Sequence, residues 1–93
     1  MSREFENIDF TLINKILKYL SNGNKKYNDI IFVFNSLGYS KYSIDRTIKL
    51  MWHHGLITNK GNIWAKIFPI LNSKNFDENH ILELTMRGRT YHQ

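Results

Sequence analysis

Polar side chains that could contact a polyanion are concentrated in residues 41–54. The set comprises Lys41, Tyr42, Ser43, Asp45, Arg46 and Lys49. On a helix, the spacings of three and four residues place Tyr42, Arg46 and Lys49 on one face, with Lys41 and Ser43 on the first turn. An Arg can donate two hydrogen bonds to a guanine edge, whereas Lys and hydroxyl groups contact phosphate oxygens. The chemistry that these residues offer is recognition of a polyanion.

The charge distribution agrees with this interpretation. The chain of 93 residues carries a net charge of +5 and has a pI near 9.6. Residues 38–60 contribute +3 of this, because four basic residues there stand against Asp45 alone. Such a surplus favours nucleic acid, a membrane surface or an acidic partner. Asp45 would be repelled by phosphate unless it accepts a hydrogen bond from cytosine or orients Arg46.

Three segments have the periodicity of amphipathic helices, namely residues 8–20, 28–37 and 41–54. Asp9 or Thr11 can cap the first helix, and Asn28 or Asp29 the second. The second segment is rich in β-branched residues, yet its apolar positions recur at helical spacing and Gly38 suits the residue after a helix. The residues expected to face inward are Ile30, Ile31, Phe34 and Leu37 in the second helix, and Ile44, Ile48, Met51 and Trp52 in the third.

The last third of the chain changes its periodicity. Residues 62–68 are β-branched and aromatic and predict a strand, residues 72–79 predict a loop, and residues 80–84 alternate as a second strand. Thr85 can cap a short helical turn over residues 86–91. Among the aromatic residues, we expect Trp52, Phe32 and Phe34 in the core. Trp64 and Phe68 either cover the helices or form an exposed patch at a partner interface.

The order of elements predicts one α+β domain over residues 1–93, with a three-helix core, a two-stranded β-hairpin wing and a short C-terminal helical turn. Residues 40–57 have a small polar start, an apolar position, Arg46, two further apolar positions and then Gly55-Leu56-Ile57. This pattern resembles the recognition-helix segment of winged helix-turn-helix regulators of the MarR and PadR kind. Residues 84–89 similarly resemble the segment that closes the wing in those families.

The resemblance implies sequence-specific binding of double-stranded DNA by a small transcriptional regulator, with the helix of residues 41–54 in the major groove. It carries over to Ser43, Arg46 and Lys49. We expect Lys41, Lys60 and Lys74 to touch phosphates and Tyr42 to touch phosphate or a thymine methyl. The resemblance also implies a homodimer. The few residues after Thr85 lack the long terminal helix of those families, so the expected interface is the apolar strand or the first helix.

A second hypothesis is a winged-helix module that binds a protein and not DNA, such as an adaptor or a regulator's antagonist from a mobile element. The apolar, proline-containing stretch of residues 63–70 and the acidic pair Asp77 and Glu78 fit this alternative. Asp45 on the expected reading face fits it too. A protein partner would then bind through residues 63–78.

Several function classes are disfavoured by the sequence. The chain has no cysteine, so disulfides, cysteine zinc sites and thiol nucleophiles are excluded. His53 and His54 are neighbours that would point about 100° apart on a helix, so we expect no metal site. No phosphate-cradling glycine loop or nucleophile elbow occurs, and we expect neither an enzyme nor a cofactor. No apolar stretch is long enough to span a membrane, and the expected location is the cytoplasm.

Overall fold

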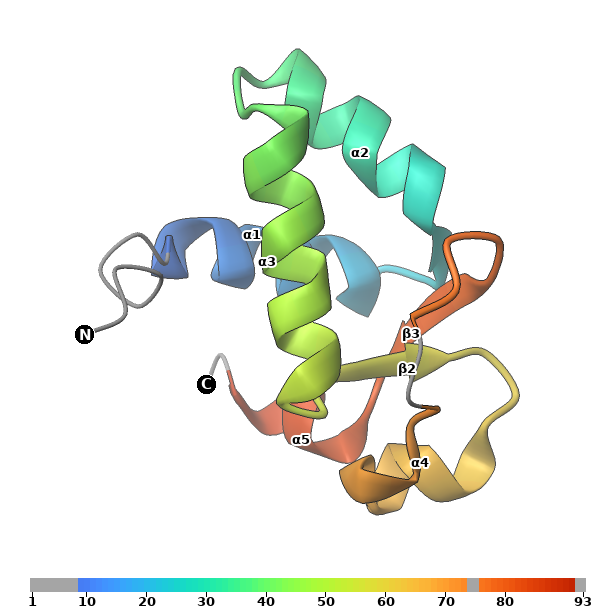
Figure 1. Ribbon diagram of the computed structural model, residues 1–93. Helices are drawn as coiled ribbons and strands as arrows, with labels where there is room; N and C mark the ends of the chain where they lie inside the picture. Colours follow the sequence, from blue (N-terminus) through green and yellow to red (C-terminus); the bar gives the residue numbers. More distant parts are fainter. Residues whose placement is uncertain (1–8, 74–75, 92–93) are drawn as a thin grey trace, which may run out of the picture.

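The computed structural model describes residues 9–73 and 76–91 (Figure 1). The first helix, α1 (Phe10–Ser21), begins where the Asp9 carboxylate accepts a hydrogen bond from the backbone N–H of Leu12 at 3.0 Å. This confirms the helix expected over residues 8–20 and assigns its cap to Asp9, not Thr11. The apolar stripe of α1 is buried; its members are Leu12, Ile13, Ile16, Leu17 and Leu20.

The second helix, α2 (Tyr27–Ser36), confirms that residues 28–37 are helical despite their β-branched composition. The predicted caps are wrong, because the helix begins one residue earlier, behind Lys26, whose side chain makes no capping hydrogen bond. Tyr27, the first residue of the helix, is buried. Two core assignments are also wrong: Phe32 is 73% exposed and Leu37 is 63% exposed. Tyr27, Ile30 and Phe34 anchor the buried face, with Ile31 half-buried.

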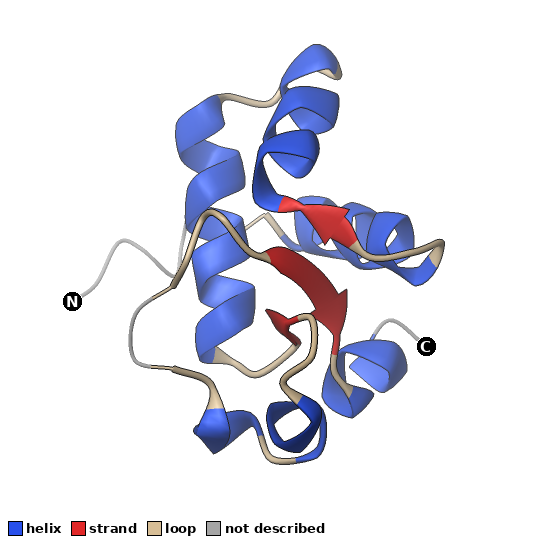
Figure 2. Ribbon diagram, turned by 90° about the vertical axis from the view of Figure 1, so that its right-hand side faces the viewer, coloured by secondary structure: helices blue, strands red, loops and turns tan. Residues whose placement is uncertain are grey.

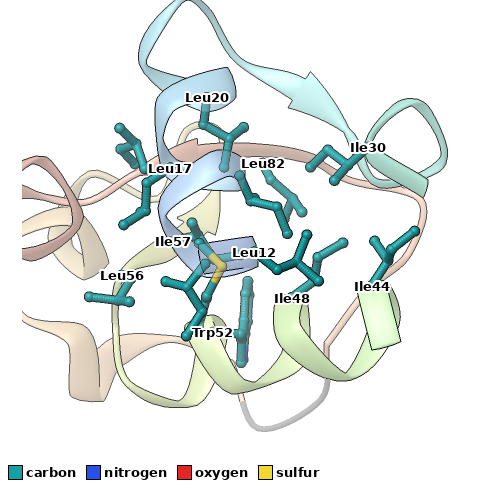
Figure 3. Packing of buried hydrophobic residues seen from close by; sticks show 14 of the residues in the cluster. Leu12, Leu17, Leu20, Ile30, Ile44, Ile48, Trp52, Leu56, Ile57 and Leu82 are labelled. Carbon is teal, nitrogen blue, oxygen red and sulfur yellow. The ribbon is translucent and has the colours of Figure 1, made fainter. Parts of the chain in front are cut away.

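The third helix, α3 (Lys41–His53), has the predicted orientation. Ser40 caps it, and Gly55 at φ +72° adopts the left-handed conformation expected just after a helix. Figure 3 shows side chains of α3 converging with those of α1, α2 and the strands in one core. The four predicted inward residues of α3 are all buried: Ile44, Ile48, Met51 and Trp52.

The sheet differs from the predicted hairpin. The described residues form a three-stranded antiparallel sheet in the order β1 (Lys25–Lys26), β3 (Ile81–Leu84), β2 (Ile57–Asn59) (Figure 2). Ile57 pairs with Leu84, and Lys25 pairs with Leu82. The second predicted strand is thus confirmed as β3, but its partners are residues 57–59 and 25–26 instead of residues 62–68.

Residues 62–68 are not a strand. They contain the short helix α4 (Ile63–Ile67), which is followed by the 3₁₀ turn η1 (Pro69–Leu71). The Asn62 side chain caps α4 by accepting a hydrogen bond from the Ala65 N–H at 3.2 Å. Both edges of β3 are already occupied by β1 and β2, so the β-branched segment finds no place beside it. The local cap then outweighs strand propensity, which is context-dependent.

The last helix, α5 (Met86–Tyr91), confirms the expected C-terminal helical turn. The Thr85 hydroxyl accepts a hydrogen bond from the Gly88 N–H at 3.1 Å and donates one to the Gly55 carbonyl. The Thr85 N–H also donates to the Leu56 carbonyl at 3.0 Å. These bonds join the start of α5 to the connection between α3 and β2. A Cβ on Gly88 would lie 2.1 Å from the Leu56 carbonyl oxygen, so this close approach requires glycine.

Candidate nucleic-acid interface

The outer face of α3 gathers five of the predicted contact residues. Lys41, Tyr42, Ser43, Arg46 and Lys49 all lie on this helix. Tyr42 is 72% exposed, and Arg46 is half-buried. Three fully buried residues on the opposite face, Ile44, Ile48 and Met51, hold the helix against the core. The sequence pattern therefore separates an anchoring face from a polar face, as predicted, and the helix presents its polar face on a rigid base.

The first turn of α3 is ordered by hydroxyl groups. The Ser40 oxygen accepts a hydrogen bond from the Ser43 N–H at 3.1 Å, and the Ser40 hydroxyl lies 3.0 Å from the Ser43 hydroxyl oxygen, to which it donates. Ser43 keeps its own hydroxyl proton for an outside acceptor such as a phosphate oxygen. The Thr47 hydroxyl donates to the Ser43 carbonyl at 2.7 Å and is buried behind this turn.

Asp45 has two partners, and neither is Arg46. One carboxylate oxygen lies 3.1 Å from the Lys49 ammonium nitrogen, and the other accepts a hydrogen bond from the Tyr27 hydroxyl of α2. Burial of Tyr27, together with the Asp45 carboxylate beside it, raises the pKa of this phenol well above its ordinary value. Asp45 thus links α2 to α3 and offsets part of the Lys49 charge. The suggested pairing of Asp45 with Arg46 is not present.

A groove of about 410 Å³ lies between the start of α1 and α3. Its lining includes Arg46, Ser43 and Tyr42 from α3, and Asp9 and Tyr39 from outside that helix. Arg46 is therefore half-buried at the wall of a groove instead of standing on a convex surface. The carboxylate of Asp9, the guanidinium of Arg46 and the phenols of Tyr39 and Tyr42 therefore line one groove.

Lys15 and Tyr39 belong to this region but were not among the predicted contact residues. The Lys15 ammonium donates to the Tyr39 hydroxyl oxygen at 3.2 Å, and it lies 5.5 Å from the centre of the Tyr39 ring. Lys15 is an exposed residue of α1. Its position on the polar side of the first helix was visible in the sequence, but its proximity to the turn before α3 depends on how α1 crosses α3.

The two remaining predicted phosphate contacts do not join this cluster. Lys60 is exposed in the turn after β2, and its backbone N–H donates to the Ile81 carbonyl at 2.8 Å. That turn lies at the far end of the molecule from the first turn of α3 in Figure 1. Lys74 lies outside the described residues. Of the predicted contact residues, five therefore lie together on α3, and Lys60 lies away from them.

The loop before β3 runs along the other flank of α3. Phe76 packs edge-on against Trp52 and Tyr27, with ring centres 5.3 and 5.5 Å apart. The Asp77 carboxylate lies 2.8 Å from a His80 ring nitrogen. A hydrogen bond from the Asn79 backbone N–H, together with the neighbouring His80, holds the pKa of Asp77 below its ordinary value. This flank of α3 is acidic, whereas the groove flank carries Lys15 and Arg46.

Comparisons with protein-family models, with curated proteins and with solved structures gave no match. Within residues 9–73 and 76–91, no group of three or more His, Asp or Glu side chains converges as a metal site. No helix in this part of the chain combines the length and the apolar character needed to cross a membrane. The proposals below therefore depend on the geometry of the described residues.

Proposed function

We propose that this chain binds double-stranded DNA by inserting α3 into the major groove, as a small winged helix-turn-helix regulator. The observation that carries the proposal is the two-faced α3, anchored by fully buried side chains, with Tyr42 and Ser43 exposed and Arg46 at the groove wall. A B-DNA major groove admits one helix, and its base edges present a donor and acceptor pattern that Arg can read. Net positive charge supplies the attraction to phosphate that does not depend on sequence.

The element order supports the winged form of this motif. α2 and α3 are joined by the short turn of residues 37–40, and β2 and β3 follow as an antiparallel pair. In the helix-turn-helix the second helix is the one that enters the groove. The connection between β2 and β3 departs from a simple hairpin wing, because it carries α4 and η1. Lys60 stands at the start of that connection, where a wing would approach the phosphates.

The contacts can be ranked by their surroundings. Arg46 is the base-reading residue of the proposal, because the groove wall limits its side chain and reduces the conformational entropy lost on binding. Lys41 and Ser43, on the first turn of α3, are placed to contact phosphate. Lys49 is a weaker contact, since Asp45 already holds its ammonium group. Lys15, close to Tyr39, adds a positive charge to the same flank.

The test compares Arg46→Ala with Lys18→Ala, which removes one positive charge from the last turn of α1. A preferred site is first selected from random duplexes, and affinity is then measured by fluorescence anisotropy at several salt concentrations. We expect Arg46→Ala to cost about 1–3 kcal/mol on the preferred site and much less on a random duplex. Lys18→Ala should cost little on either. Full-strength binding of the preferred site by Arg46→Ala would remove Arg46 from the reading role.

The protein-binding alternative is supported by a different part of the molecule. Residues 63–71 expose apolar side chains, which is unusual for a small monomeric domain. A chain that co-purifies with one partner protein and shows no salt-sensitive affinity for duplex DNA would favour this alternative. Steep salt sensitivity of duplex binding would favour the DNA proposal.

A further inference from the structure

The most exposed apolar region of the described chain is the surface formed by residues 63–71, here called the 63–71 surface. Six large apolar side chains on it are half or more exposed. They are Ile63 (67%), Trp64 (66%), Ile67 (50%), Phe68 (51%), Ile70 (90%) and Leu71 (50%). We propose that two copies of this chain associate through the 63–71 surface. The inference does not rest on DNA binding, since it concerns a different face of the molecule.

Hydrogen bonds at both ends of the segment hold its backbone in place. At the start, the Asn62 side chain caps α4 through the Ala65 N–H, and Ala65 is fully buried. At the end, the Asn72 amide donates to the Trp52 carbonyl at 3.0 Å and to the Ile57 carbonyl at 3.2 Å. The Thr58 hydroxyl donates to the Asn72 carbonyl oxygen as well. A surface fixed in this way loses little conformational entropy on association.

The exposed apolar area of the 63–71 surface is close to the area that each partner buries in a stable dimer. With about 200 Å² for each fully exposed large apolar side chain, the six exposed fractions correspond to roughly 750 Å² per copy. A standard specific interface buries about 800 Å² on each partner. The largest apolar patch of a typical monomer measures about 300–600 Å². The summed exposed area of the six side chains lies above that range and close to what one partner contributes to a two-fold interface.

The charge of the surface favours a second copy over other occupants. Lys66 is the only charged residue in positions 63–71, and its ammonium lies 3.3 Å from the carboxylate of Glu83, which is 8% exposed. Two chains of net charge +5 can therefore meet here without placing unpaired like charges in contact. An acidic protein or an anionic membrane would instead favour a cationic surface. In a two-fold dimer the same patch serves both partners, so no second apolar surface is needed.

The arrangement leaves the polar face of α3 accessible. In Figure 1, α4 lies at the end of the molecule opposite to the turn between α2 and α3. A dimer formed through α4 and η1 would therefore not cover Tyr42 or Arg46. Association and DNA binding can be measured separately on the same protein.

The experiment is sedimentation velocity of the full chain without DNA, over concentrations that bracket the micromolar range expected for a modest interface. The test variant is Ile70→Asp, because Ile70 is 90% exposed and its replacement leaves the core intact. The matched control is Phe32→Asp, which places the same acid at a 73% exposed apolar position of α2. Thermal unfolding, measured at protein concentrations below the dimer dissociation constant, checks that each variant is folded.

The wild-type chain should show a concentration-dependent monomer–dimer equilibrium. Ile70→Asp should raise the dissociation constant at least about 30-fold, as loss of an interface hot spot does, and Phe32→Asp should leave it unchanged. A wild-type chain that stays monomeric throughout would overturn the proposal. The proposal would equally be overturned by a monomeric chain that binds neutral lipid vesicles or one different protein. Equal effects of the two variants would overturn it as well.

Discussion

Replacement of Asp45 by Asn should strengthen DNA binding. The Asp45 carboxylate is the acidic group on α3 and holds the Lys49 ammonium at 3.1 Å. Asn keeps an oxygen that accepts the hydrogen bond of the Tyr27 hydroxyl, so the link between α2 and α3 survives. The substitution therefore removes a negative charge from the binding face and frees Lys49 without removing a buried acceptor.

The magnitude follows from Coulomb's law and from the exposure of the pair. One charge about 8 Å from the nearest phosphate, at an effective dielectric constant of about 50, is worth about 0.8 kcal/mol, or about fourfold in affinity. Release of Lys49 allows at most one additional phosphate contact. That contact would steepen the slope of log affinity against log salt concentration by up to about 0.9. Loss of the Asp45–Lys49 pair should cost only about 0.3–0.5 kcal/mol of stability, because its side chains are 30% and 47% exposed.

Fluorescence anisotropy with one mixed-sequence duplex at low and physiological salt provides the assay. The matched control is Tyr27→Phe, which removes the other partner of Asp45 and leaves the charge in place. This control should lower stability and leave the salt slope unchanged. An Asp45→Asn protein with a normal melting temperature, but with no gain in affinity and no steeper slope, would refute the argument that Asp45 faces DNA.

Two further predictions concern stability. Because the pKa of Tyr27 is raised in the folded state, its contribution to the free energy of unfolding is complete below pH 10 and falls as the pH rises above that value. Absorbance titration should show one phenol that resists ionisation in the wild type and not in Tyr27→Phe, and the absence of such a phenol from the wild type would contradict this. Gly88→Ala should cost about 2–3 kcal/mol, or about 10 °C or more in melting temperature, because its Cβ would meet the Leu56 carbonyl. Gly38→Ala, whose Cβ meets nothing within 4 Å but whose φ of +106° is strained, should cost less, and the opposite ranking by differential scanning fluorimetry would contradict the packing argument.

The three long helices were predictable because their information is local. Apolar spacing identifies α1, α2 and α3, and the capping residue Asp9 and the following Gly55 mark two of their ends. The inward face of α3 was correct at every predicted position. Residues three and four apart on a helix must share a face, so no knowledge of the rest of the fold is needed.

The segment of residues 62–68 was mispredicted because its conformation depends on distant residues. Its composition favours a strand, but β1 and β2 already occupy both edges of β3. β1 itself has only two residues, too few for an alternating pattern to be recognised. The exposure of Phe32 was missed for a related reason, since aromatic residues are normally buried and only the packing of other elements decides. Trp64 and Phe68, for which the sequence left burial and exposure open, are exposed.

The helix that carries most of the candidate residues was predictable, whereas the hydrogen bonds around them were not. Helical spacing placed Tyr42, Arg46 and Lys49 on one helix, as the structure has them. The hydrogen bond from Tyr27 to Asp45 joins residues 18 apart, and the one from Lys15 to Tyr39 joins residues 24 apart. Such contacts depend on the crossing of α1 and α2 with α3, which no local pattern encodes.

The most direct test of DNA recognition by α3 is a titration of isotope-labelled protein with mixed-sequence duplex DNA, followed through its amide NMR shifts at low and physiological salt. The proposal predicts that shifts cluster on residues 40–49 and around the groove at Tyr39, and that they weaken sharply as salt rises. An α3 whose amide signals stay unchanged at low salt would contradict the proposal.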